Sequence, residues 1–208
     1  FAQMGVEIGG EQMVEGARSW GFNQDVPIDM PAPAESVFPT DVVSNPPKLA
    51  QSAIGQSDVQ STPLEMAMVA GAVANGGNLM RPHLMTEIRN SQGNLITETQ
   101  PETWLTPLSP ENAGILRRDM VGVVEDGTAT ALQIPGAEVG GKTGTAQLGT
   151  DPPRSHTWII GFAGPPGQPA TVAVAVVVLD QSGGSEATGG RVAGPIARAV
   201  LETALARP

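Results

Sequence analysis

The chain has 208 residues, 40% of them hydrophobic, which corresponds to one domain or a large part of one. Its formal net charge of −10 argues against nucleic acid as the main partner, because proteins meet a phosphate backbone with basic surfaces. It contains no cysteine, which excludes disulfides and thiolate metal sites. The longest wholly apolar run, residues 172–179, is far too short for a membrane-spanning helix.

The first part of the chain carries signals for two helices separated by a loop. Apolar side chains at helical spacing in residues 10–21 predict a first helix. Residues 25–48 contain six prolines, which exclude helix interiors and central strands, so this segment is predicted to be an extended surface loop. Thr62 is a suitable N-cap, Pro63 fits the first helical position and Glu65 completes a capping box, which predicts a second helix.

The rest of the chain mixes strand and helix signals. Apolar runs and alternating patterns predict strands, and capping or turn residues delimit the elements. The predicted elements are a hairpin at 83–98, a helix at 109–124, strands at 137–147, 156–163 and 170–180 with a Pro-rich turn near 151–153, a loop containing Gly183, Gly184, Gly189 and Gly190, and a final helix that Pro195 opens.

The stretch GGKTGTAQ at residues 140–147 contains Lys142, one of only two lysines in the chain. A lysine on a strand edge is commonly solvated and discourages aggregation between strands. Residues 136–143 also match the phosphate-loop pattern G-x-x-x-x-G-K-[ST]. That pattern requires a helix directly after it, and the glycine and prolines of residues 144–153 do not favour one.

A third interpretation places Lys142 on a strand that lines an active site. Thr143 and Thr145 alternate with Gly144, so both hydroxyls are predicted to face one side of the strand and Lys142 the other. An ammonium group near two hydroxyls suits a carboxylate. Gly144 would let a substrate backbone approach, and a free N–H at the strand edge can stabilise an oxyanion.

The segments GKTGTAQ, HTWIIGFAG and VAVAVVVLD, in this order, resemble the C-terminal half of the transpeptidase domain of penicillin-binding proteins. IGQSDVQSTPLEMAMVAGAVANGG, EDGTAT and GPIARAVLETAL resemble further parts of that domain, so the resemblance covers most of residues 50–205. It is greatest to class B, monofunctional D,D-transpeptidases of the mycobacterial type. Residues 1–208 would then be the C-terminal portion of an α+β domain in which helices flank both faces of an antiparallel sheet. Residues 137–180 would be its active-site and core strands, and 195–206 its closing helix.

The resemblance also implies roles in a serine acyl-transfer reaction on peptidoglycan stem peptides that end in D-Ala-D-Ala, with β-lactams as inhibitors. Lys142 would hold the serine of the family's S-x-N motif and supply positive charge. Thr143 and Thr145, beside Gly144, would bind the terminal carboxylate, and the backbone N–H of Thr145 would be an oxyanion donor. Gln147 and Trp158 are candidate cleft neighbours, although core packing is the commoner role for a tryptophan. No metal or cofactor is implied.

The other two motifs of the family, S-x-x-K and S-x-N, are missing from the sequence. We therefore expect an N-terminal half of the same protein to carry both motifs and the nucleophile, and the 208-residue piece alone to be inactive. The resemblance places the whole protein on the extracytoplasmic face of the bacterial cell membrane, anchored by an N-terminal helix outside this chain.

Two other functions share these features. A D,D-carboxypeptidase or β-lactamase differs in passing the acyl group to water, and a non-catalytic penicillin-recognising sensor or scaffold would lack the upstream nucleophile. Outside the motif, His83 and His156 have no partners that suggest a triad or a metal site. Gln56 and Asp58 precede the capped helix and could border the cleft, although turn formation is the more conservative interpretation.

Overall fold

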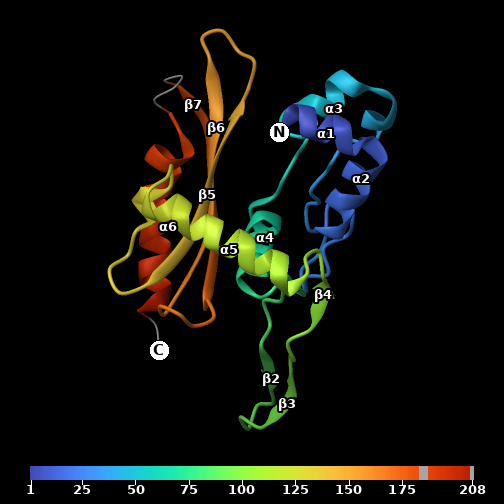
Figure 1. The fold of residues 1–208 in the computed structure, drawn as a ribbon. Helices are drawn as coiled ribbons and strands as arrows, with labels where there is room; N and C mark the ends of the chain where they lie inside the picture. Colours follow the sequence, from blue (N-terminus) through green and yellow to red (C-terminus); the bar gives the residue numbers. More distant parts are fainter. Residues whose placement is uncertain (183–186, 207–208) are drawn as a thin grey trace.

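The computed structural model describes residues 1–182 and 187–206, which form two parts, here called layers, that lie side by side, one built on a sheet and the other mainly helical (Figure 1). One layer is an antiparallel sheet with the order β5–β6–β7, in which β5 spans Glu138–Gln147, β6 spans Arg154–Gly164 and β7 spans Val172–Ser182. Helix α6 (Gly189–Leu205) packs on one face of this sheet and α4 (Pro63–Ala74) on the other. The predicted α+β class, with an antiparallel sheet between helices, is confirmed.

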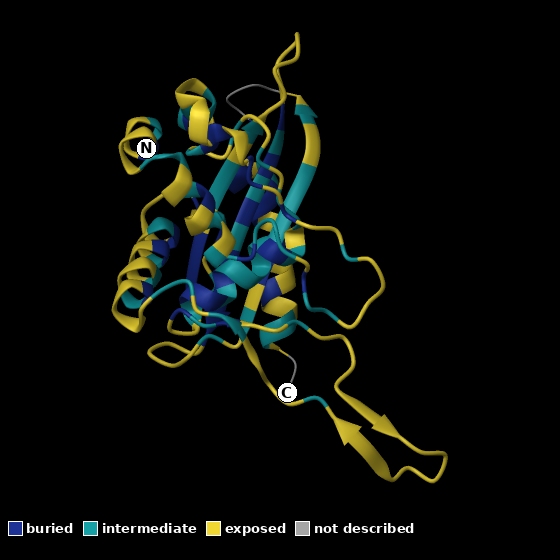
Figure 2. Ribbon diagram, turned by 90° about the vertical axis from the view of Figure 1, so that its right-hand side faces the viewer, coloured by how far each residue is buried: buried dark blue, intermediate teal, exposed yellow. Residues whose placement is uncertain are grey.

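The second layer consists of short helices and two small antiparallel sheets. The hairpin formed by β2 and β3 projects away from the body (Figure 1) and is exposed along its length (Figure 2). Within residues 1–182 and 187–206, no helix combines the length and the apolar character needed to cross a membrane. The remaining elements are α1 (Ala2–Ile8), α2 (Gly10–Ser19), η1 (Asp41–Ser44), α3 (Pro46–Ser52), β1 (Leu79–Met80), β2 (Glu87–Arg89), β3 (Leu95–Glu98), β4 (Thr103–Leu105), α5 (Pro110–Glu125) and η2 (Thr130–Leu132).

The core divides along the two faces of the sheet. On the face towards α6, Ile159 of β6 is fully buried and packs in a cluster with Ala197 and Leu201 of the helix. On the other face, Phe162 of β6 is fully buried and packs with Val73 of α4 and Met120 of α5. Because side chains alternate along a strand, this division also shows which side each neighbouring residue of the sheet faces.

The Pro-rich loop predicted at 25–48 is only partly correct. Pro46 and Pro47 occupy the first turn of α3, and the Oδ1 atom of Asn45 accepts a hydrogen bond from the backbone N–H of Lys48 at 3.2 Å. Proline is tolerated there because the first N–H groups of a helix have no partner inside it. The same density of prolines therefore marks a helix start as well as a loop.

The C-terminal helix begins earlier than predicted, at Gly189, and Pro195 lies inside it. Proline removes one hydrogen bond from a helix interior. The buried face of α6 extends on both sides of this position, from Ala193 to Leu201, and its packing against the sheet offsets that loss. Of the predicted glycine loop, Gly183 and Gly184 lie outside the described residues.

The N-terminus of α4 has only half of the predicted capping box. The Oγ1 atom of Thr62 accepts a hydrogen bond from the backbone N–H of Glu65 at 3.1 Å, as expected. The reciprocal bond is absent, because the N–H of Thr62 donates to the buried hydroxyl of Ser36 at 3.0 Å. The carboxyl group of Glu65 instead lies fully buried, without a hydrogen-bond partner among the described residues. Burial raises the pKa of Glu65 from 4.5 to about 7.

Replacing this carboxyl group, Glu65→Gln, is expected to stabilise the protein only at higher pH. The pKa of Glu65 is higher in the folded than in the unfolded state, so its ionisation lowers stability as the pH rises from 4.5 to about 7. At pH 8 the free energy of unfolding of the variant should exceed that of the wild type by about 3 kcal/mol, and at pH 4.5 the two should be nearly equal. Urea unfolding at both pH values measures this difference. A difference that is the same at both values would contradict the assignment.

Candidate functional site

The GGKTGTAQ stretch forms the second part of β5, an outer strand of the described sheet. The strand continues through Lys142 and Thr143 to Gln147 without a break, and each of these residues is in register with one on β6. No helix begins directly after Thr143, because β5 continues to Gln147, so the backbone geometry of a phosphate loop is not present here. The phosphate-loop interpretation is therefore excluded.

The register of β5 with β6 places Lys142 and the two threonines on opposite faces. Lys142 is opposite Ile160, which belongs to the cluster on the α4 side, and Thr143 is opposite Ile159, which faces α6. Thr145, two residues further on, lies on the same side as Thr143. The alternation read from the sequence thus matches the register.

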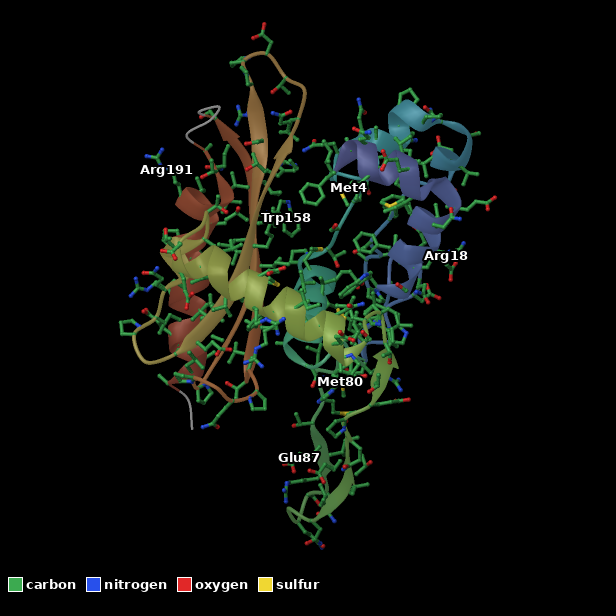
Figure 3. All side chains as sticks on the ribbon, in the orientation of Figure 1. Met4, Arg18, Met80, Glu87, Trp158 and Arg191 are labelled. Carbon is green, nitrogen blue, oxygen red and sulfur yellow. The ribbon has the colours of Figure 1, made fainter. Side chains whose placement is uncertain are left out.

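A pocket of about 660 Å³ lies between this part of the sheet and the segment that leads into α4. It is lined by Lys142, Thr143, Gly144 and Thr145 on β5, and by Trp158 on β6. Trp158 projects from β6 towards the helices of the second layer (Figure 3). Among the described lining residues, Lys142 is the only lysine or arginine and there is no aspartate or glutamate. In a chain with a net charge of −10, this pocket is suited to an anionic group.

Hydrogen bonds fix the polar groups around Lys142. The Nζ atom of Lys142 donates to the backbone carbonyl of Thr143 at 2.7 Å. The hydroxyl of Thr143 is hydrogen-bonded to that of Thr128, in the loop after α5, with 2.8 Å between the oxygens. The ammonium group of Lys142 and the hydroxyls of Thr143 and Thr128 keep further hydrogen-bonding capacity for a ligand, since an ammonium has three donors and a hydroxyl can both donate and accept.

The backbone of Thr145 is available at the free edge of β5. The side-chain Nε2 atom of Gln56 donates to the carbonyl oxygen of Thr145 at 3.3 Å, from outside the sheet. In an antiparallel strand the N–H and the C=O of one residue point to the same side. The N–H of Thr145 therefore also points away from β6, in the direction required of an oxyanion donor.

The two glycines before Lys142 make room for core side chains. A Cβ atom on Gly140 would overlap the ring of Phe162, and one on Gly141 would approach the Cδ1 atom of Leu132 to 2.6 Å. Gly144 is different, since its Cβ would approach only the Cβ atom of Trp158, at 3.2 Å. The glycine pair is thus explained by packing, and of these three glycines Gly144 alone lines the pocket.

The comparisons with known proteins agree with this geometry. A family model described as the penicillin binding protein transpeptidase domain matches residues 1–202. The chain belongs to the penicillin-binding protein transpeptidase domain family. It is 37% identical over 207 residues to the peptidoglycan D,D-transpeptidase PbpA of Mycolicibacterium smegmatis, and 37% identical over 208 residues to PbpA of Mycobacterium tuberculosis. Each match covers 99% of this chain and 41% of the relative.

Solved transpeptidase domains share the fold. The D,D-transpeptidase domain from Eggerthella lenta superimposes with a TM-score of 0.84 at 34% identity, over 98% of this chain and 50% of that one. Penicillin-binding protein A from M. tuberculosis, solved as a penicillin G acyl-enzyme complex, gives a TM-score of 0.83 at 38% identity, over 98% and 45%. The chain thus spans about half of these transpeptidase structures, and the resemblance to mycobacterial PbpA is confirmed.

The pocket does not contain every transpeptidase-site residue suggested by the sequence, and it contains others. Gln147 is exposed and does not line the pocket, and Asp58 does not line it either. Gln56, expected to be a turn residue, lines the pocket directly. His156 also lines it, and its Nδ1 atom accepts the backbone N–H of Asp180 at 3.0 Å. Thr128 was missed as a neighbour of Thr143, although the EDGTAT segment that contains it is part of the resemblance.

Proposed function

We propose that this chain supplies one wall of the active site of a peptidoglycan D,D-transpeptidase, which cross-links stem peptides through a serine acyl-enzyme. The observation that carries the proposal is the pocket along β5. Among its described lining residues, Lys142 is the only lysine or arginine, and there is no aspartate or glutamate to neutralise it. A ligand with a terminal carboxylate, such as D-Ala-D-Ala or a β-lactam, matches this distribution of charge.

The residues of β5 take the following roles in the proposed reaction. The carboxylate of the donor peptide lies at the outer edge of β5, which the ammonium group of Lys142 reaches from one face of the strand and the hydroxyls of Thr143 and Thr145 from the other. The serine hydroxyl attacks the carbonyl carbon of the penultimate D-alanine, and the N–H of Thr145 stabilises the negative charge that develops on the carbonyl oxygen. The C–N bond breaks, the terminal D-alanine leaves with a proton, and the acyl group remains on the serine. An amine of a second stem peptide then takes the acyl group and releases the serine.

The nucleophile in this proposal comes from an N-terminal half of the same protein, which carries the S-x-x-K and S-x-N motifs. Two facts support this. No serine in the 208 residues begins either motif, and the chain matches only 41% of the length of its PbpA relatives. Residues 1–208 are then the C-terminal portion of the transpeptidase domain, and Lys142 reaches the serine of the S-x-N motif across the pocket. The complete protein acts on the extracytoplasmic face of the membrane, held by an N-terminal helix, in cell-wall synthesis during growth and division.

Intact mass spectrometry of the complete protein, before and after incubation with penicillin G, tests this function. We expect a single covalent adduct with the mass of the drug, on a serine outside residues 1–208. Incubation with a stem-peptide donor and an amine acceptor should then yield the cross-linked product. Released acid as the sole product would favour a carboxypeptidase or β-lactamase, and the absence of any adduct would favour a sensor or scaffold.

A further inference from the structure

The turn that presents Gln56 to the pocket has an unusual backbone. Gly55 has a φ of 71° and Ser57 a φ of 62°, so Gln56 lies between two residues in the left-handed region. Serine adopts this conformation rarely, and residues held in it concentrate at sites that bind ligands. The side chain that this turn positions, that of Gln56, is therefore a candidate for a role in ligand binding.

Both ends of this turn are anchored. On its N-terminal side, the N–H of Gln56 donates to the carbonyl of Gln51 in α3 at 3.1 Å. On its C-terminal side, the Nζ atom of Lys48 lies 2.6 Å from a carboxylate oxygen of Asp58 and 2.8 Å from one of Asp41. The side chain of Lys48 is only 18% exposed, which favours a persistent ion pair over a mobile surface contact. The second lysine of the chain thus holds the turn in place.

The anchored turn aims the Gln56 side chain at one acceptor. Its amide donates to the carbonyl oxygen of Thr145, 89 residues away in the sequence. An extended ligand that pairs with the free edge of β5 needs this same carbonyl. In a hydrogen-bonded pair of antiparallel strands, two opposite residues exchange both N–H···O bonds. A ligand residue whose carbonyl oxygen accepts from the N–H of Thr145 therefore donates its own N–H to the carbonyl of Thr145.

We propose that Gln56 is a competing cap on β5, whose amide occupies the carbonyl of Thr145 until a backbone N–H of the acyl donor replaces it. This inference rests on the proposed function. A ligand with a suitably placed N–H exchanges one hydrogen bond for another, and the displaced Gln56 amide, which is half-buried, turns to water. A ligand without such an N–H gains nothing by displacing Gln56, and it leaves the hydrogen bond between Gln56 and Thr145 in place. The cap thus weakens the binding only of donors that carry an amide next to the reacting residue, because only these donors have to displace it.

Gln56→Met removes the donor while keeping the length of the side chain. In the complete protein, the apparent dissociation constant for penicillin G, which has an acylamino N–H, should fall about threefold, with an unchanged acylation rate constant at saturation. Penicillanic acid has the ring and the carboxylate but no acylamino group, so its acylation should not change. Gln51→Met, the same substitution on an exposed residue of α3 that does not line the pocket, should alter neither reaction. The unfolding midpoint of each variant is measured in parallel.

An equal change with both β-lactams would assign Gln56 a structural role and overturn the cap, as would weaker reaction with penicillin G alone. If the wild-type protein reacts with neither compound, the proposed function fails. The competition by Gln56 is then tested by equilibrium binding of acetyl-D-Ala-D-Ala, which is measured by the change in tryptophan fluorescence. Binding that is about threefold tighter in Gln56→Met supports the cap, and equal or undetectable binding in both proteins overturns it.

Discussion

Replacing Lys142 by alanine is expected to lower the second-order rate constant for acylation of the complete protein by penicillin G about 10- to 100-fold. Lys142 is the only lysine or arginine among the described residues of the pocket, and no aspartate or glutamate there competes with the ligand for its ammonium group. A hydrogen bond to a charged group contributes about 1.5–3 kcal/mol, and its loss on one side leaves the carboxylate of the ligand less well paired. The effect should therefore exceed that of any single neutral contact in the site.

Two further variants distinguish the effect of a positive charge at position 142 from the effect of removing a positive charge elsewhere on the protein. Lys142→Arg retains the charge but not the compact shape of the ammonium, and should recover part of the rate. Arg198→Ala removes a charge on the outer side of α6, where Arg198 pairs with Glu202 at 2.8 Å, and should leave acylation unchanged. The comparison is made by stopped-flow or by mass spectrometry of the adduct. Acylation of Lys142→Ala at the wild-type rate would remove Lys142 from the site.

Local signals in the sequence were sufficient for the elements that build the pocket. The start of α4 was predicted from the Thr62 cap and Pro63, because a helix terminus depends on residues within one turn of each other. Strand β5 and its alternation of faces were predicted for a similar reason, since the period of a strand is local. The family resemblance then located the candidate site on that strand.

Contacts between distant segments were not predictable in this way. Gln56 and Thr145 are 89 residues apart, and nothing near either of them indicates the other. The same limitation applies to Gly140 and Gly141, whose small size is explained only by the side chains of Phe162 and Leu132 that pack against them. Substrate approach was predicted for Gly144 alone, and no residue near Gly140 and Gly141 in the sequence indicates their contacts with the core. Glu65 followed the capping pattern but lost its expected partner to Ser36, from another segment.

Gly189→Ala is expected to destabilise the domain by about 3 kcal/mol and to impair acylation at the same time. Gly189 opens α6 directly against the sheet. A Cβ atom there would overlap the carbonyl oxygen of Trp158 and approach that of Gly144 to 2.7 Å. Both neighbours are backbone atoms, so no side-chain rotation can relieve the contact and the helix must move away from β5 and β6. Because Gly144 and Trp158 both line the pocket, that movement reaches the site.

The matched control is Gly16→Ala, in the middle of α2, where an added Cβ meets nothing within 4 Å. This variant should be unchanged or up to about 1 kcal/mol more stable, because alanine is the better helix former. Urea unfolding of the complete protein measures the stability of both variants, and penicillin acylation at a temperature where both are folded measures the site. If Gly189→Ala were destabilised but acylated at the wild-type rate, the start of α6 would support the fold without positioning β5. Loss of both properties would show that the contact between α6 and Gly144 holds the edge strand in its reactive position.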